Sequence, residues 1–189
     1  MSKADTHQEI MDVAQELLQS KGFHAFSYAD IAQRIGIKKA SIHYHFATKN
    51  DLGKALIKHY RNVFDNARAL IDDRHADALA RLEAYAKLYR DALAQDNRMC
   101  LCGMLAADFM TLPEDIQQEV SSFMAENAAW LAQTLEDARV RQAIAFDGDA
   151  QREAELLLSG LEGGMLIARS MGGVEQLDQI VQQLFQKYL

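Results

Sequence analysis

The amino-acid sequence predicts an all-α fold of about nine helices, because apolar residues recur at helical spacing along most of the chain. The alternation of apolar and polar residues that is typical of strands is nearly absent. A single proline occurs among 189 residues, so few positions interrupt a helix from within. Three short helices are expected in the first 50 residues, and a body of longer helices is expected after them.

Capping patterns and glycines mark where the helices begin and end. Thr6-x-x-Glu9 has the pattern of a capping box and begins a first helix that ends at Gly22. Thr48-x-x-Asp51 begins a long fourth helix in the same way. The one proline opens a later helix, since its missing N–H would have no helical partner there. Further helices are expected at residues 77–95, 100–110, 114–141, 149–171 and 174–188.

A glycine-containing turn joins the second and third helices. Ser27-x-x-Asp30 is a capping box, and Gly36 lets the chain leave the second helix through a left-handed conformation. The third helix, at about residues 38–46, buries Ile42 and leaves hydrogen-bond donors on its other sides. This arrangement predicts a helix-turn-helix, whose second helix suits the major groove of DNA.

The run G-I-K-K-A-S-I-H-Y-H-F-A-T-K, residues 36–49, resembles the DNA-binding domain of TetR-family transcriptional regulators. The match extends over roughly residues 6–60, and it departs from the family pattern at Lys38 and His43. The resemblance implies a repressor that binds a palindromic operator in double-stranded DNA as a homodimer. The residues that carry the resemblance are Gly36, Ser41, Ile42, Tyr44, His45, Phe46 and Lys49.

Residues of the turn and of the third helix are the candidates for DNA contact. Lys49 resembles the family's phosphate-binding lysine, and a solvated lysine is the alternative. Lys39, Ser41 and His43 are the expected readers of base edges. The others are expected to contact or attract phosphates, although Tyr44 could instead pack on the first helix. The predicted DNA-binding set is Ser27, Tyr28, Lys38, Lys39, Ser41, His43, Tyr44, His45 and Lys49.

The charge distribution agrees with two domains, a helix-turn-helix DNA-binding domain at residues 1–50 and a helical effector-binding and dimerisation domain at residues 51–189. The net charge is −7, yet the first 50 residues carry six Lys or Arg against five Asp or Glu. The acidic body would be repelled by phosphate, so the first domain must face the DNA. Its basic patch is small, and two copies acting together are expected to be needed.

The helix expected at residues 149–171 contains three glycines, although glycine is unfavourable in the interior of a helix. With Ser159 and Ala168 they form a smooth strip that another helix can approach closely. One interpretation is tight packing within a subunit, and the other is a homodimer seam formed with the last helix. The predicted dimer interface is Gly160, Gly163, Gly164, Leu177, Val181 and Leu184.

Aromatic and methionine side chains are concentrated in the middle helices. This pattern is more often plain core, but it also suits an adaptable apolar pocket for a small hydrophobic or aromatic effector. Asp108 or Asn127 could hold a polar end of that effector. The predicted ligand-binding set is Tyr85, Tyr89, Cys102, Phe109, Phe123, Asn127 and Trp130.

The two cysteines, Cys100 and Cys102, allow two interpretations. They can be small buried core groups, or thiols that release the repressor from DNA when oxidised or alkylated, with Arg98 lowering a thiol pKa. At this spacing on a helix they diverge, so a disulfide between them is not expected. The side chains of His43 and His45 diverge for the same reason, and neither a metal site nor a cofactor is expected.

Several functional classes are not expected from this sequence. No catalytic triad, phosphate-binding glycine loop or Glu-x-x-His pair is recognisable, so the chain is not expected to be an enzyme. No apolar run approaches the roughly 18 residues of a membrane span, and no signal peptide is recognised, which favours the cytoplasm. A DNA-binding protein without an effector is a further alternative.

Overall fold

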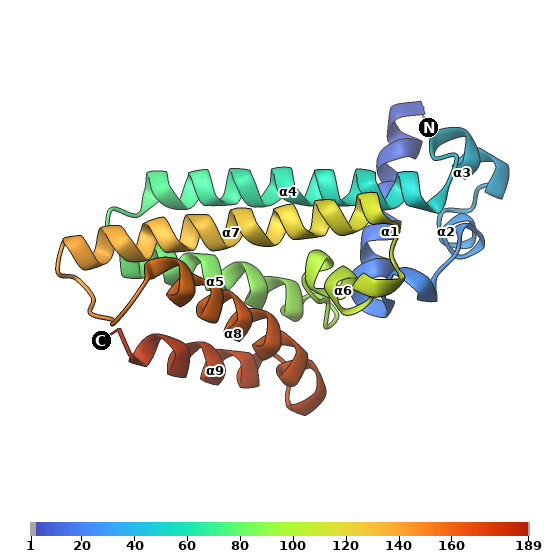
Figure 1. The fold of residues 1–189 in the computed structure, drawn as a ribbon. Helices are drawn as coiled ribbons and strands as arrows, with labels where there is room; N and C mark the ends of the chain where they lie inside the picture. The colour runs from blue at the N-terminus through green and yellow to red at the C-terminus, as the bar shows by residue number, and fades with distance from the viewer. Residues whose placement is uncertain (1–2, 189) are drawn as a thin grey trace. The chain divides into compact units, whose positions relative to one another are not determined.

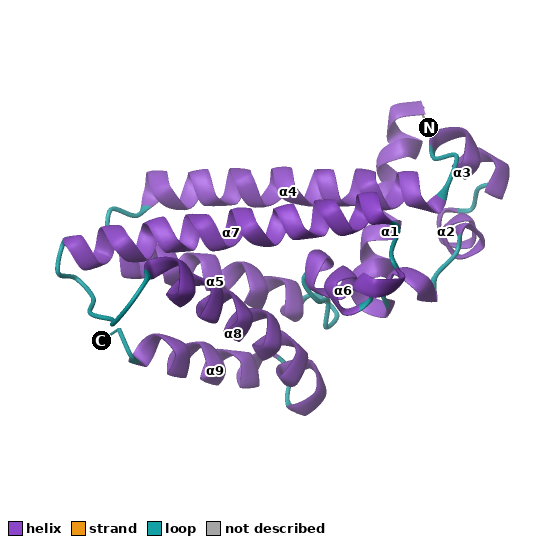
Figure 2. Cartoon of the chain, viewed as in Figure 1, coloured by secondary structure: helices purple, strands orange, loops and turns teal. Residues whose placement is uncertain are grey.

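The computed structural model describes residues 3–188, which form helices joined by turns without any strand (Figure 1; Figure 2). Residues 1, 2 and 189, which the predicted domains include, lie outside this range. The predicted all-α class is confirmed, and two short 3-10 helices, η1 (Phe23–Ala25) and η2 (Phe109–Thr111), accompany the α-helices. The described α-helices are α1 (Lys3–Lys21), α2 (Tyr28–Ile35), α3 (Lys39–His45), α4 (Lys49–Arg74), α5 (Ala78–Ala94), α6 (Leu101–Ala107), α7 (Glu114–Val140), α8 (Ala150–Met171) and α9 (Val174–Gln186).

The chain divides into two compact units. Unit 1 consists of Met1–Val63 and Leu101–Ser122, and unit 2 consists of Phe64–Cys100 and Phe123–Leu189. Helices α4 and α7 each contribute their first part to unit 1 and their second part to unit 2. The predicted boundary at residue 50 separates a DNA-binding domain from an effector-binding domain by function, and it stays a prediction.

Most helix ends lie where the capping patterns predict them. At the start of α4, the Thr48 hydroxyl donates to the Asp51 carboxylate at 2.7 Å, and the Asp51 N–H donates back to the Thr48 hydroxyl at 3.1 Å. The carboxylates of Asp77 and Asp149 accept backbone N–H groups at the starts of α5 and α8. The prediction for α1 is wrong: it begins at Lys3, so Thr6 lies inside the helix. Lys3 and Ala4 are good helix formers, and Asp5 in the first turn interacts favourably with the helix dipole, so the helix extends toward the N-terminus.

Unit 1 is built around one apolar core. Each of its helices α1, α2, α3 and α4 places a fully buried side chain in it, namely Ile10, Ile31, Ile42 and Leu52. These positions lie at the helical spacing that predicts an inward face. The short helices α2 and α3 therefore hold fixed positions within unit 1, although helices of this length are marginal in isolation.

In unit 2, α8 and α9 pack against one another through two glycines. A Cβ atom at Gly160 would lie 2.7 Å from the Leu184 side chain, and one at Gly164 would lie 3.1 Å from Ile180 and 3.3 Å from Leu177. The smooth strip on α8 thus allows the last helix of the same chain to approach. Gly160 and Gly164 therefore have partners within one chain, and the expectation that they face a partner subunit together with Leu177 and Leu184 stays a prediction.

Candidate DNA-binding and effector sites

The helix-turn-helix of unit 1 has the local geometry that its sequence predicts. The Ser27 N–H and hydroxyl both donate to the Asp30 carboxylate at 2.7 Å, which lowers the pKa of Asp30. Gly36 has φ 80° and donates its N–H to the carbonyl of Ala32 at 2.9 Å. The capping box starts α2 and the left-handed glycine ends it, so an interval of three residues, 36–38, separates α2 from α3.

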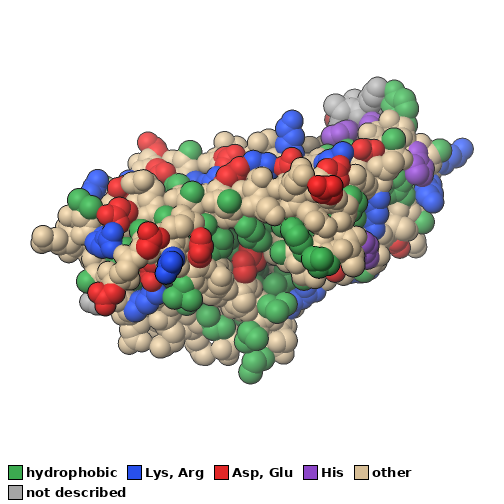
Figure 3. All heavy atoms as spheres, in the orientation of Figure 1, with side chains coloured by type: hydrophobic (Ala, Val, Ile, Leu, Met, Phe, Trp, Pro, Cys, Tyr) green, Lys and Arg blue, Asp and Glu red, His purple; other side chains and the backbone are tan. Residues whose placement is uncertain are grey.

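Helix α3 is fixed by one face and exposes the other. Ile42 is fully buried in unit 1, whereas Tyr44 is 68% exposed. Histidine, lysine and arginine side chains gather over this part of the molecule in Figure 3. Positive and hydrogen-bonding groups on an exposed helix are what contact with DNA requires. The predicted DNA-binding residues that are exposed here are Lys38, Lys39, His43 and Tyr44, and those that are half-buried are Ser41 and His45.

The ring of His43 has a defined orientation. Its Nδ1 lies 3.2 Å from the carbonyl oxygen of Ala47, and its ring meets the Tyr28 ring edge-on with centroids 4.8 Å apart. A carbonyl only accepts, so Nδ1 carries the proton of this bond. In the neutral ring Nε2 is then an acceptor, which suits the amino group of cytosine or adenine in the major groove.

Lys49 has a different position from the one expected of a free phosphate contact. Its ammonium group donates to the carbonyls of Phe23 and Phe26 and lies 4.2 Å from the centroid of the Phe26 ring. Burial lowers the pKa of Lys49, partly opposed by the charge of Asp30. Two of its three donors therefore connect the η1 turn to the start of α4 within unit 1, and the predicted phosphate contact of Lys49 stays a prediction.

Tyr28 and Ser27, which were also predicted to contact phosphates, have hydrogen-bond partners within unit 1, and their contact with DNA stays a prediction. Tyr28 is 5% exposed, and its hydroxyl donates to the carbonyl of Phe46 at 3.0 Å. Burial, and then the charge of Asp51, raise the pKa of Tyr28 to about 12, so it stays neutral. The N–H and hydroxyl of Ser27 are used by the capping box. Both residues position α2 against the recognition helix.

Unit 2 contains a buried polar chain at the place where the effector pocket is predicted. The Tyr85 hydroxyl donates to Asn127 Oδ1 at 2.8 Å, so the Tyr89 hydroxyl, 3.1 Å away, donates to Tyr85. Asn127 Nδ2 in turn donates to the carbonyl of Phe123 at 2.7 Å. Desolvation raises the pKa of both tyrosines far above their ordinary range. Every member of this chain has a partner, as buried polar groups require.

Aromatic rings enclose that polar chain. Trp130 stacks on Tyr85 with centroids 5.2 Å apart and donates its Nε1–H to Asp72 at 3.0 Å. Phe64 meets Phe123 edge-on at 5.1 Å. Five predicted ligand-binding residues, Tyr85, Tyr89, Phe123, Asn127 and Trp130, are therefore brought together in unit 2 as a closely packed cluster. The other two, Cys102 and Phe109, belong to unit 1, as does Asp108.

Glu162 on α8 is a candidate residue that the sequence analysis did not identify. Both of its carboxylate oxygens are buried without a hydrogen-bond partner. Burial raises the pKa of Glu162 to about 7, and the neighbouring Cys100 thiol partly opposes that rise. The charge of Glu162 also raises the pKa of Tyr85 and Tyr89. A charged residue in a helix usually lies on the face exposed to solvent. Nothing in the sequence therefore indicates that Glu162 is buried.

The two cysteines are free thiols, and both are buried. Cys100 is 1% exposed and Cys102 is fully buried. Such burial is typical of small apolar core groups. Cys100 belongs to unit 2, where the carboxylate of Glu162 is its electrostatic neighbour, and Cys102 belongs to unit 1.

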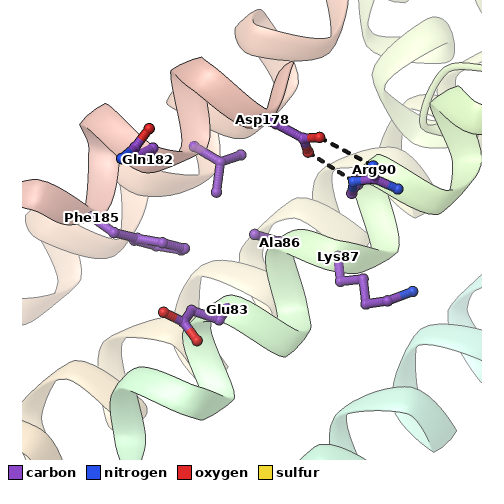
Figure 4. A pocket seen from close by; sticks show the side chains of 8 residues that line it. Glu83, Ala86, Lys87, Arg90, Asp178, Gln182 and Phe185 are labelled. Carbon is purple, nitrogen blue, oxygen red and sulfur yellow. Dashed lines mark hydrogen bonds and ion pairs between the residues drawn. The ribbon is translucent and has the colours of Figure 1, made fainter. Parts of the chain in front are cut away.

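Two surfaces of unit 2 bear on assembly. Gly163 has open space around it, and Leu156 and Ile167, at 57% and 47% exposed, share its face of α8. Val181 does not lie on this face: it lines a groove of about 300 Å³ between α5 and α9 with Ala86 and Phe185. Figure 4 shows this groove, with the Arg90–Asp178 ion pair at one end. Gly163 thus lies on an open apolar face of α8, whereas Val181 and Leu184 line surface grooves elsewhere in unit 2.

The described part of the chain shows neither a metal site nor a membrane span. No group of three His, Cys, Asp or Glu side chains is arranged to hold a metal ion among these residues. No helix within residues 3–188 is both long and apolar enough to cross a membrane.

These features define a helix-turn-helix DNA-binding protein with a helical regulatory body. The chain belongs to the TetR family of bacterial regulatory proteins. The family's N-terminal model matches residues 10–56, and the model of the tetracyclin repressor-like C-terminal domain matches residues 78–184. The protein is thus a DNA-binding transcriptional regulator and not an enzyme.

Individual relatives support the same assignment. A TetR-family regulator from Agrobacterium tumefaciens superposes with a TM-score of 0.95 at 30% identity, covering 99% of each chain. The transcriptional repressor NemR of Escherichia coli is 23% identical over 177 residues, covering 92% of this chain and 89% of NemR. The nucleoid occlusion factor SlmA of Marinobacter nauticus is 24% identical over 162 residues, covering 85% and 82%.

Proposed function

We propose that the protein is a repressor that binds a palindromic operator as a homodimer and leaves it when a small, hydrophobic or aromatic effector binds in unit 2. The observation that carries the DNA-binding part is the exposed row of Lys38, Lys39, His43 and Tyr44 on a helix whose opposite face is buried. The likeness to NemR, named a transcriptional repressor, supports repression rather than activation.

The dimer is inferred from the apolar face around Gly163 and from the small basic patch. Leu156, Gly163 and Ile167 recur at helical spacing, and an exposed apolar stripe of this kind marks an interaction surface. One recognition helix makes too few phosphate contacts for tight binding at physiological salt. A symmetric pair would present two such helices to half-sites roughly 34–36 Å apart.

Helix α4 is the proposed link between effector and DNA. Its first residue, Lys49, is bonded to the η1 turn, and Phe64 of the aromatic cluster lies further along the same continuous helix. An effector that shifts the second part of this helix would tilt the first part and so change the spacing of the two recognition helices. A coupling of about 1–3 kcal/mol would lower operator occupancy several-fold to a hundredfold.

The test uses an inverted repeat taken from the DNA upstream of the encoding gene. The purified protein should bind this segment in fluorescence anisotropy, and a panel of aromatic and aliphatic compounds should contain one that releases it. In a selection from random DNA, Lys39→Ala and Ser41→Ala should change the preferred operator bases, whereas Lys38→Ala should not. Unchanged preferences for both readers would contradict the assignment of α3.

A thiol trigger is the second candidate, because Cys100 and Cys102 are both free thiols. Oxidation or alkylation of Cys100 or Cys102 would introduce bulk into a buried position and release the operator. Peroxide and an electrophile should then act on the wild type and fail on the Cys100→Ser, Cys102→Ser double variant. Release that persists in the double variant excludes this trigger.

A DNA-binding protein without an effector is the third candidate, favoured by the likeness to the nucleoid occlusion factor SlmA. Such a protein would bind its DNA sites with an affinity that no small molecule and no oxidant alters. The same compound panel therefore separates it from the first two candidates.

A further inference from the structure

The groove between α7 and α8 in unit 2 combines an apolar floor with acidic walls. Its volume is about 400 Å³, within the range of small-molecule sites. Leu158 and Ala128 are buried at its floor, and Met124 forms part of a wall. The lining contains two carboxylates and neither lysine nor arginine. The lining residues are Met124, Ala125, Ala128, Gln151, Glu155, Leu158, Ser159 and Glu162.

Glu162 is the unusual member of this lining. The residue as a whole is only half-buried, yet both carboxylate oxygens are buried. Its exposed part is therefore the carbon stem, and the carboxyl group lies beneath the groove wall, where Cys100, Tyr85 and Tyr89 are its electrostatic neighbours. A buried carboxylate without a hydrogen-bond partner is costly, and a group that donates to it would remove that cost.

We propose that the α7–α8 groove is an effector site for an apolar molecule that carries a protonated amine, with the Glu162 carboxylate as its anchor. The ammonium donates to the two unpartnered oxygens, and the hydrocarbon part covers Leu158 and Ala128. Glu155, two helical turns before Glu162 on the same helix, adds a second negative charge at the rim. This inference deepens the proposed effector response and rests on it.

The route to the carboxyl group requires only side-chain motion. Met124 is half-buried, and its unbranched thioether changes conformation easily. Rotation about the bonds of the Glu162 side chain brings the carboxylate toward the groove. The site is separate from the face around Gly163 that is proposed for dimerisation, because its lining residues on α8 lie on the side turned to α7. The proposed dimer therefore leaves this groove uncovered.

The experiment compares 2-phenylethylamine with its neutral isostere 2-phenylethanol, using isothermal titration calorimetry on the full-length protein. The amine is expected to bind the wild type about ten- to hundredfold more tightly than the alcohol, as for a hydrogen bond to a charged group. Glu162→Gln keeps the shape of the side chain and should abolish this preference. Glu155→Gln is the matched control on the same helix and should keep most of it.

Three outcomes would overturn the inference: equal affinity for amine and alcohol, no binding of either compound, or an amine preference that survives Glu162→Gln. Circular dichroism of each variant establishes that it is folded. Operator release is measured separately by anisotropy with the same amine. If the amine binds through Glu162 but leaves the operator complex intact, the anchor stands and the proposed coupling to DNA fails.

Discussion

The roles of individual side chains in this protein are set by what lies next to them in space. Lys49 and Lys39 are both lysines in the DNA-binding segment, yet one donates to two carbonyls and the other is exposed. Glu162 and Glu155 also differ, since the carboxyl group of Glu162 is buried and Glu155 is exposed. These differences lead to two predictions at the residue scale.

The first prediction is a pH dependence of stability that comes from Glu162. Its pKa is raised from 4.5 to about 7 in the folded state, where Cys100, Tyr85 and Tyr89 surround the carboxyl group. The folded state therefore keeps a proton that the unfolded state has lost. This contribution to stability is full below pH 4.5 and is lost as the pH rises through about 7, costing about 3 kcal/mol in all.

Urea unfolding of the wild type and of Glu162→Gln between pH 4.5 and 8 measures this term. The difference in unfolding free energy between the two proteins should grow in favour of Glu162→Gln as the pH rises. Glu155→Gln, the exposed control, should follow the wild type. A pH-independent difference would mean that the pKa of Glu162 is not raised in the folded state.

The second prediction separates the two lysines. Lys49→Met keeps the carbon stem but removes the donors to the Phe23 and Phe26 carbonyls, so it should lower the unfolding free energy by about 1–2 kcal/mol. Lys39→Met should leave stability unchanged within about 0.5 kcal/mol, because it is an exposed surface residue. Thermal unfolding measures both. Equal stability of the two variants would mean that Lys49 is free to contact phosphate.

At the scale of elements, α8 shows two different glycine-containing faces. Gly164 lies against α9 of the same chain, with Ile180 and Leu177 within van der Waals reach, while Gly163 beside it faces open space. Adjacent positions in a helix point about 100° apart, so neighbouring glycines can serve different partners. The same substitution made at Gly164 and at Gly163 therefore tests folding at one position and assembly at the other.

The third prediction compares Gly164→Leu with Gly163→Leu. The first should lower the unfolding free energy by about 1–3 kcal/mol, because a leucine overpacks the α8–α9 contact. The second should leave the fold intact and weaken the dimer. Sedimentation velocity and thermal unfolding of both variants measure the two effects. A folded Gly163→Leu dimer of unchanged affinity would place the interface on another surface.

At the scale of the whole molecule, the charge distribution and the proposed symmetry determine how the protein meets DNA. The net charge of −7 means that most of the surface repels phosphate, and the exposed basic residues around α3 are the exception. A dimer doubles the number of phosphate contacts, and the acidic remainder of its surface still does not attract DNA. Binding should therefore depend on the geometry of two half-sites.

The fourth prediction concerns that geometry. DNA with two half-sites should bind far more tightly than DNA with one, because the second contact is made within a complex that already exists. Inserting about five base pairs between the half-sites rotates one of them by half a helical turn and should remove this gain. Anisotropy at fixed salt compares the three DNAs. Equal affinity for all of them would indicate a protein that binds as a monomer.

The sequence by itself determined the features that depend on residues close together along the chain. The Ser27–Asp30 capping box, the left-handed Gly36 and the inward face of α3 each arise from neighbours within a few residues, so local chemistry is enough to predict them. The long run of helices followed from the spacing of apolar residues in the same way. The sequence predicted which residues form the aromatic cluster, but it did not predict the hydrogen bonds that connect them.

Only the tertiary structure decided which partner each side chain meets across large sequence separations. The hydroxyl of Tyr28 donates to a carbonyl 18 residues away, and the ammonium of Lys49 donates to carbonyls 23 and 26 residues away. Gly160 and Gly163 look alike in sequence, but one faces Leu184 and the other faces open space. The burial of Glu162 likewise depends on neighbours from other helices. Burial and partners are properties of the assembled core, and no local pattern encodes them.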